Sequence, residues 1–192
     1  MEIKVVFLGE SCTGKTQLIK VCCGYEFDKN SPSTLGCSYI EKYIRINNIN
    51  YLLLLWDICG SVSIRPFNKL FIKNSYFFIL VYDITSKESF DNIYYWYNEI
   101  QDLGIDAIIG VVGTYLDLFE ERKVDTEIGK KFADSIGAKF IEVSAKLDIE
   151  PFNIMLIELT KNYIKKYGNK DNRNQHRKFE FTKNTLLKYY KY

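Results

Sequence analysis

The sequence predicts an α/β fold in which a mostly parallel six-stranded sheet, with one antiparallel strand, is flanked by five helices. Apolar runs of strand length alternate with amphipathic helical stretches, which is typical of a parallel sheet covered by helices. A glycine-rich turn follows the first apolar run, and hydrophobic residues make up 47% of the 192 positions, enough for a substantial core. The length suits one domain with a short appendage.

The expected elements follow one another along the chain. Residues 3–8 form the first buried strand, and a helix over about 15–23 follows the glycine-rich turn. Two strands, 38–47 and 50–57, are joined at Asn47-Asn48, a tight-turn pair that indicates an antiparallel hairpin. The other expected elements are strands at 76–82, 107–112 and 140–143, helices at 87–103 and 126–136, and a last helix from Pro151 to about Tyr167.

Composition excludes several function classes. The formal net charge of +2 is too small to indicate a nucleic-acid-binding protein. An odd number of cysteines, five, and a single histidine argue against a disulfide framework or a zinc site. We interpret the cysteines as small buried side chains in a reducing compartment. No apolar stretch approaches the roughly 20 residues needed to cross a bilayer. The protein is therefore expected to be cytoplasmic.

The chain divides into a domain at 1–167 and a tail at 168–192. Gly168 follows the last expected helix, and basic residues outnumber acidic ones towards the end of the chain. The tail begins with a polar, linker-like stretch and ends in a segment whose apolar positions are compatible with a helix.

A phosphate-binding loop is the clearest functional signal. Residues 9–16, GESCTGKT, match GxxxxGK[ST] without a mismatch and lie between a predicted strand and a predicted helix. Glycines let successive N–H groups point at phosphate oxygens, and the helix N-terminus adds partial positive charge. Lys15 supplies a full charge to the outer phosphates, and the Thr16 hydroxyl is suited to Mg²⁺. We therefore expect a P-loop NTPase fold.

A second functional signal, Asp57 followed by Gly60, lies at the end of the long apolar strand predicted at 50–57. Asp57 can hold Mg²⁺ through water, and Gly60 lets its own amide approach the third phosphate of a nucleotide. The alternative is an Asp and a Gly that simply end a strand.

With these motifs, residues 1–167 resemble the Ras superfamily of small GTPases, and most closely its Rab branch. The stretch LVYDITSKESFDNIYYWYNEI at 80–100 and the spacing of Thr16, Thr34 and Asp57 carry the resemblance. The resemblance implies a switch that binds GTP or GDP with Mg²⁺ and whose switch loops are ordered by the third phosphate.

The resemblance also implies residue roles. Phe27 would place a ring edge against guanine, the Ala145 amide would meet the guanine carbonyl, and the Lys146 stem would cover the base. The implied nucleotide-binding set is Glu10, Ser11, Cys12, Thr13, Gly14, Lys15, Thr16, Gln17, Phe27, Thr34, Gly60, Thr114, Tyr115, Asp117, Ser144, Ala145 and Lys146. The implied Mg²⁺ ligands are Thr16, Thr34 and Asp57, and the implied catalytic set is Lys15, Thr34, Gly60 and Ser61.

Protein partners are implied at the switch regions. Tyr39, Trp56 and Phe71 fall where Rab proteins carry three aromatic residues that link the switches to effectors, and exchange factors and GTPase-activating proteins would use the same regions. Ordinary core packing is the alternative for each ring. A role in vesicle trafficking or signalling follows by analogy alone.

Two departures from the family pattern concern chemistry. Ser61 replaces the glutamine that orients the attacking water, and its side chain is too short to span to the water, so hydrolysis should be slow. The base-reading NKxD element is TYLD at 114–117. Asp117 can still accept both N1–H and the N2 amino group of guanine. Thr114 reaches less far than Asn, and Tyr115 could offer a face or edge to the base or point to solvent.

The third departure concerns membranes. No cysteine follows Cys59, so the chain as given cannot be prenylated at its end. Action without a lipid, weak attachment of the basic tail to anionic membranes, and continuation into a longer polypeptide all remain open. Contact with endomembranes would be peripheral.

Rival classes are a pseudo-GTPase and a nucleotide kinase. The first would hold nucleotide constitutively and serve as an interaction module, which Ser61 and Thr114 favour. The second needs an arginine-rich lid, whereas Arg65 and Arg122 are isolated in the sequence.

Overall fold

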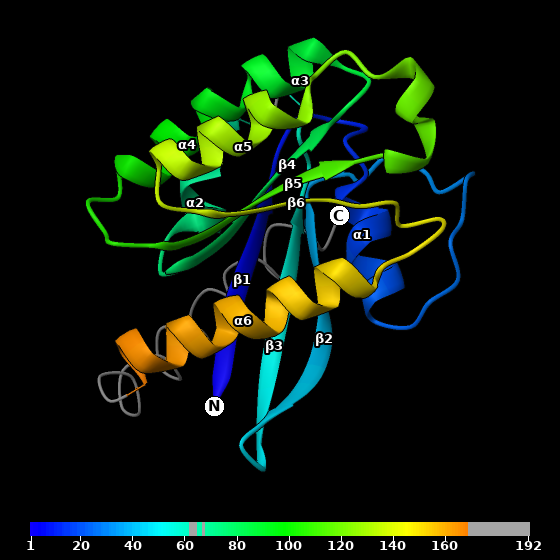
Figure 1. The fold of residues 1–192 in the computed structure, drawn as a ribbon. Helices are drawn as coiled ribbons and strands as arrows, with labels where there is room; N and C mark the ends of the chain where they lie inside the picture. Colours follow the sequence, from blue (N-terminus) through cyan, green and yellow to red (C-terminus); the bar gives the residue numbers. More distant parts are fainter. Residues whose placement is uncertain (62–64, 67, 169–192) are drawn as a thin grey trace.

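A computed structural model describes residues 1–61, 65–66 and 68–168, which form a six-stranded sheet between two layers of helices (Figure 1). The strands are β1 (Glu2–Leu8), β2 (Cys37–Ile46), β3 (Ile49–Ile58), β4 (Phe77–Asp83), β5 (Ile108–Thr114) and β6 (Lys139–Glu142). The helices are α1 (Lys15–Cys22), α2 (Asn68–Ile72), α3 (Lys87–Asp91), α4 (Ile93–Gln101), α5 (Thr126–Ser135) and α6 (Glu150–Tyr167), with a 3₁₀ helix, η2, at Leu116–Glu121.

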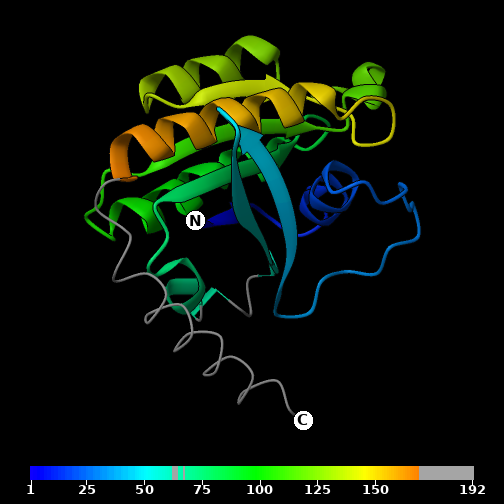
Figure 2. The ribbon, with the colours of Figure 1, turned by 90° about the horizontal axis from the view of Figure 1, so that it is seen from below.

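The sheet has the strand order β2-β3-β1-β4-β5-β6, and only the β2–β3 pair is antiparallel. The mostly parallel six-stranded sheet with one antiparallel strand is thus confirmed. Asn47 and Asn48, with φ of 49° and 62°, make the predicted tight turn of the hairpin. Figure 2 shows the loop between α1 and β2 extending away from the sheet.

Each face of the sheet has its own hydrophobic core. On one face, α1 and α6 pack on the strands through side chains such as Leu18, Phe152 and Leu156. On the other face, α2, α3, α4 and α5 contribute Phe71, Phe90, Trp96 and Phe132, among others. Because the parallel strands are buried on both faces, β1 and β4 are nearly continuous apolar runs, as the sequence indicated.

The described residues contain six α-helices rather than the expected five. The helix predicted at 87–103 is divided at Asn92, whose ψ of −7° interrupts the helical backbone between α3 and α4. The five-residue helix α2 is too short to give a periodic signal. The expectation of a helix near the chain end falls on residues 169–192, which lie outside the described residues.

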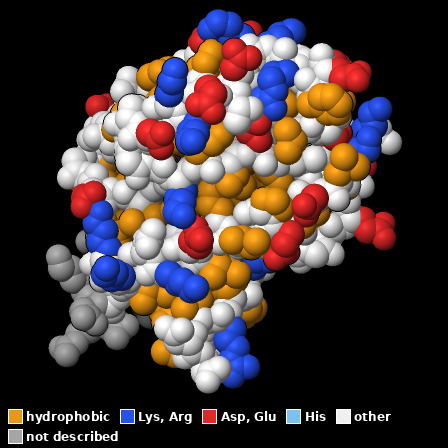
Figure 3. Space-filling view, viewed as in Figure 1, with side chains coloured by type: hydrophobic (Ala, Val, Ile, Leu, Met, Phe, Trp, Pro, Cys, Tyr) orange, Lys and Arg blue, Asp and Glu red, His pale blue; other side chains and the backbone are white. Residues whose placement is uncertain are grey.

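The surface seen in Figure 3 mixes basic and acidic side chains, with hydrophobic side chains exposed between them. Among the helices of the described ranges, none combines the length and the apolar character that crossing a membrane requires.

A partly buried lysine joins the sheet to α2. The Lys4 ammonium lies 4.7 Å from the centre of the Trp56 ring and donates hydrogen bonds to the carbonyl oxygens of Phe71 and Lys73 at the end of α2. Burial lowers the pKa of Lys4 from 10.5 to about 8.

We therefore predict a pH-dependent stability difference between the wild type and a Lys4→Met variant. Between pH 8 and pH 10.5 the unfolded chain holds a proton on Lys4 that the folded chain has lost. The free energy of unfolding of the wild type, relative to the variant, should therefore rise with pH across this range, by up to about 1.4 kcal/mol per pH unit. Urea unfolding of both proteins from pH 7 to pH 10 measures this difference in the free energy of unfolding. A difference that stays constant with pH would contradict the prediction.

Candidate functional site

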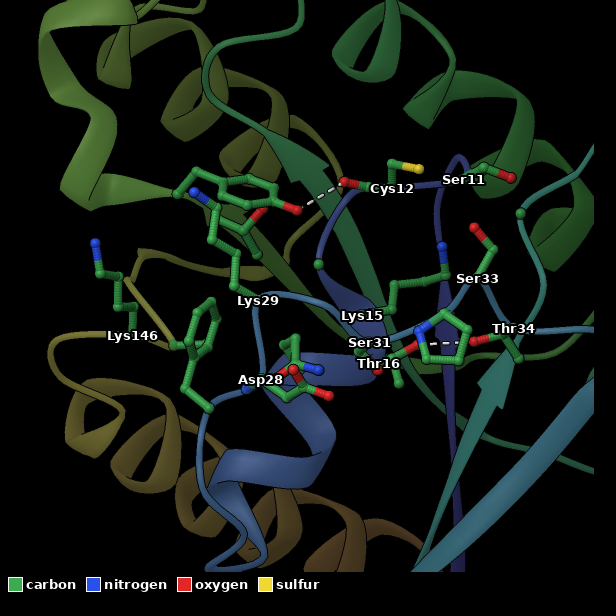
Figure 4. Close-up of a pocket in the computed structure, with 18 of the residues that line it drawn as sticks. Ser11, Cys12, Lys15, Thr16, Asp28, Lys29, Ser31, Ser33, Thr34 and Lys146 are labelled. Carbon is green, nitrogen blue, oxygen red and sulfur yellow. Dashed lines mark hydrogen bonds between the residues drawn. The ribbon is translucent and has the colours of Figure 1, made fainter.

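A cavity of about 630 Å³ opens at the carboxyl ends of β1, β3 and β5, where ligands bind in open α/β sheets (Figure 4). Its size is in the range of small-molecule and cofactor sites. Predicted site residues that line it are Ser11, Cys12, Gly14, Lys15, Thr16, Gln17, Phe27, Thr34, Gly60, Thr114, Tyr115, Asp117, Ala145 and Lys146. The structure thus brings together residues predicted from five separate segments of the chain.

The loop between β1 and α1 curls around the Lys15 side chain. The Lys15 ammonium donates to the carbonyl oxygens of Gly9 at 2.9 Å and of Glu10 at 2.6 Å. The residue is only 5% exposed, and burial lowers the pKa of its ammonium to about 8. Gly14, with φ of 81°, is the N-cap of α1, so the helix N-terminus faces the same cavity.

Three oxygen-bearing side chains gather beside Lys15. The Thr16 hydroxyl donates to Asp57 Oδ2 at 2.6 Å, the Thr34 hydroxyl donates to the same oxygen at 2.9 Å, and the two hydroxyls are 2.8 Å apart. Asp57 is 4% exposed, and its Oδ1 has no hydrogen-bond partner in the described part of the chain. Hydroxyl and carboxylate oxygens are ligands that Mg²⁺ prefers, so this set fits that cation. Among the residues described, no group of three or more His, Cys, Asp or Glu side chains is arranged to hold a metal ion.

The opposite end of the cavity holds an oriented carboxylate. Ser144 donates to Asp117 Oδ1 at 2.6 Å and accepts from the N–H of Leu147 at 3.2 Å. The Lys146 ammonium lies 3.9 Å from Asp117 Oδ2. Figure 4 shows Lys146 and Lys29 at one end of the cavity, with Thr16 and Thr34 at the other. Ser144 therefore fixes the direction of the carboxylate without lining the cavity itself.

Gly60 lies directly against the phosphate-binding loop. A Cβ on Gly60 would come within 2.4 Å of Gly9 O and Ser11 N and within 2.3 Å of the carbonyl carbon of Glu10. Since no side chain fits there, glycine is required for this contact. Ser61, the next residue, is half-buried.

The structure gives Thr114 and Tyr115 contacts that the sequence did not indicate. The buried Thr114 hydroxyl bonds to the carbonyl oxygens of Thr13 at 2.8 Å and Tyr82 at 2.9 Å. The Tyr115 hydroxyl donates to the carbonyl of Cys12 at 2.9 Å, the bond marked by a dashed line at Cys12 in Figure 4. Both hydroxyls are thus bonded to the phosphate-binding loop.

Glu10, expected in the nucleotide-binding set, directs its side chain away from the cavity. Its Oε1 accepts from Arg65 Nη2 at 2.6 Å and from Trp96 Nε1 at 3.0 Å, and the Arg65 guanidinium lies 4.3 Å from the centre of the Tyr95 ring. The hydrogen bond between Glu10 and Lys15 is made by the Glu10 backbone carbonyl. The Thr13 side chain also points into the loop rather than into the cavity. The residue is 1% exposed, and its hydroxyl donates to the Glu10 carbonyl at 2.9 Å.

The arginines that the sequence left isolated both have carboxylate partners. Besides the Arg65–Glu10 pair, Arg122 makes two bonds of 2.7 and 2.8 Å to the Glu142 carboxylate. Both guanidinium groups are therefore paired with carboxylates of the fold, which argues against the arginine-rich lid that a nucleotide kinase needs.

The three aromatic residues expected to contact effectors are less exposed than that role suggests. Trp56 and Phe71 are 2% and 3% exposed, whereas Tyr39 is half-buried and stacks on Trp56 with ring centres 5.3 Å apart. Of the three, only Tyr39 is exposed enough to contact a partner.

Further cavity residues were not in the predicted set. Most belong to the loop before β2, where no repeating pattern or motif marks a side chain as facing a ligand. They are Asp28, Lys29, Ser31, Pro32, Ser33, Ile58, Cys59 and Leu118.

Comparison with known proteins gives a consistent family assignment. A family model described as "Ras family" matches residues 4–164. "Ras-related protein Rab-21" of Homo sapiens is 35% identical over 144 residues, which cover 74% of this chain and 64% of that protein. "Ras-related protein Rab-22A" of Homo sapiens is 32% identical over 161 residues, which cover 83% of this chain and 82% of that protein. The match to Rab-21 spans slightly less than two thirds of its length.

The Ser144–Asp117 hydrogen bond generates a prediction. A Ser144→Ala variant leaves the carboxylate free to rotate, so affinity for GDP, the ligand expected from the sequence, should fall about threefold to tenfold. Ser135→Ala is the matched control, because within the described part of the chain the Ser135 hydroxyl bonds only to the Phe132 carbonyl on α5. Fluorescence titration with labelled GDP measures the affinity of each variant. Equal affinities for the two variants would refute the prediction.

Proposed function

Because the chain belongs to the Ras family and is a Rab-like small GTPase, we propose that it works as a switch that binds GTP and GDP with Mg²⁺ and hydrolyses GTP slowly. The observation that carries the proposal is the cavity in which a buried lysine, a helix N-terminus and an oriented carboxylate face one space. Residues 1–167 would form the nucleotide-binding domain, and 168–192 a separate basic tail.

Phosphates would lie on the loop at residues 9–16. The Lys15 ammonium, partly satisfied by loop carbonyls, would exchange these for the charged oxygens of the outer phosphates. The Gly60 amide would approach the third phosphate from the opposite side, because its backbone packs directly on the loop. Lys15 and Gly60 would stabilise the charge that develops during hydrolysis.

Mg²⁺ would be held by the hydroxyls of Thr16 and Thr34, with Asp57 behind them. When bound, this cation neutralises phosphate charge. The Oδ1 of Asp57, which has no hydrogen-bond partner among the described residues, supports a water-mediated role for that carboxylate. Because Thr34 belongs to the loop before β2, its contact would couple the state of the nucleotide to the order of that loop.

Guanine would be read at the Asp117 end. The Asp117 carboxylate accepts from both N1–H and the N2 amino group, which adenine does not offer in the same arrangement. Phe27 and the stem of Lys146, both lining the cavity, would pack on the base, and the Ala145 amide would bind its carbonyl oxygen.

Cellular roles follow from the relatives, whose names mark them as Ras-related Rab proteins. We propose a part in vesicle trafficking or signalling, with regulators and effectors at the switch regions, in the cytoplasm or peripherally on endomembranes.

The direct test is nucleotide identity and affinity. Guanine nucleotide should be released when the purified protein is denatured, and labelled GDP should bind at least tenfold more tightly than labelled ADP. Lys15→Ala should lose most of this affinity, since it removes the only buried cation at the phosphate end among the residues described. Equal affinity for GDP and ADP, or an unaffected Lys15→Ala variant, would overturn the proposal.

Hydrolysis gives a separate prediction. A Ser61→Gln variant gains a side chain that can reach the attacking water, so its single-turnover rate should rise about tenfold to a hundredfold above that of the wild type. GDP affinity is the control and should not change. A wild-type rate already equal to that of the variant would contradict the role of Ser61, and nucleotide that neither turns over nor exchanges would favour the pseudo-GTPase.

A further inference from the structure

The chain's TYLD element at 114–117 contacts the phosphate-binding loop at two successive peptides. Thr114 bonds to the Thr13 carbonyl and Tyr115 to the Cys12 carbonyl, at 2.8 and 2.9 Å. The Tyr115 ring also covers the loop, since a Cβ on Gly14 would lie 3.6 Å from its Cε2. These are contacts to a loop backbone rather than to the Asp117 end of the cavity.

These two contacts fix the directions of the backbone N–H groups of Thr13 and Gly14. In a trans peptide the C=O and the following N–H point in opposite directions. When Tyr115 holds the Cys12 carbonyl, the N–H of Thr13 therefore points away from Tyr115. In the same way, the N–H of Gly14 points away from Thr114, which holds the Thr13 carbonyl. Within the described ranges, neither of these N–H groups donates to a protein acceptor. They remain available to an anion in the loop.

Both ends of the tyrosine contact have unusual backbone conformations. Cys12 has φ of 63° and Tyr115 has φ of 61°, in the left-handed region that large side chains rarely adopt. Such conformations persist where surrounding contacts hold them, and they cluster at functional sites. Partial burial raises the pKa of the Tyr115 phenol, so the hydroxyl keeps the proton that it donates.

We propose that Tyr115 is a positioning residue for the phosphates: its hydroxyl fixes the Cys12–Thr13 peptide so that the Thr13 N–H faces the diphosphate, while base recognition rests on Asp117. The inference rests on the proposed function, because it assigns a phosphate-binding role within that nucleotide site. It differs from both sequence-based alternatives for Tyr115, a ring offered to the base and a side chain pointing to solvent.

The test compares Tyr115→Phe with Tyr94→Phe, a matched control on α4 with a half-exposed ring. Affinities are measured for GDP and for inosine diphosphate, which lacks the N2 amino group that Asp117 reads. Tyr115→Phe should weaken both ligands equally, about threefold to tenfold, and leave their ratio unchanged. Thermal unfolding of the nucleotide-free proteins should be the same for the wild type and the variant within about 2 °C.

A spectroscopic readout separates positioning from general loosening. On addition of GDP, the Thr13 amide proton should shift downfield in the wild type and much less in Tyr115→Phe, whereas the Ala145 amide should respond equally in both. Unchanged GDP affinity in the variant, a changed ratio of the two ligands, or an unaltered Thr13 shift would overturn the inference. A wild type that binds neither diphosphate would instead refute the proposed function.

Discussion

A buried ammonium within a backbone loop is the interaction on which the rest of the site depends. Lys15 is almost fully buried and is held by the carbonyls of Gly9 and Glu10, with no carboxylate in salt-bridge range among the residues described. Burying a cation is costly, and nearby negative charge, chiefly that of Asp57, offsets only part of this cost, so the pKa of the Lys15 ammonium still falls to about 8. An anion in the loop relieves that cost. The first strand, the first helix and Gly60 all contribute to enclosing this one charge.

Local conformation follows from the sequence where it depends on a few neighbouring residues. The loop at 9–16 lies between a strand and a helix, as its motif predicts, because the motif sets glycines, lysine and threonine in a fixed order within one short segment. The paired asparagines at 47–48 adopt the positive φ values that their turn demands. In both cases the residue types and the conformation are linked within a few positions, so a single sequence contains the information.

Contacts between distant segments were predicted less well. Nothing near Glu10 in the sequence indicates that its carboxylate turns towards Arg65 and Trp96, because those partners come from other elements. Similarly, the family pattern places Trp56 and Phe71 at the switch regions, yet the packing of α2, α3, α4 and α5 against the sheet decides that both rings are buried. The loop before β2 contributes cavity residues without any periodic signal.

The departures from the family pattern at positions 61, 114 and 115 differ in what they require of a side chain. Tethering a carbonyl needs only a donor at the correct distance, and the hydroxyls of Thr114 and Tyr115 both provide one. Orienting a water molecule over a phosphate needs reach as well, and Ser61 has a single carbon between its backbone and its hydroxyl. The phosphate cradle can therefore tolerate altered side chains around it, since backbone N–H groups form the cradle itself. On the proposed function the hydrolytic step would not tolerate such changes, because it would depend on one extended side chain. A chain with this combination is expected to retain nucleotide binding more fully than turnover.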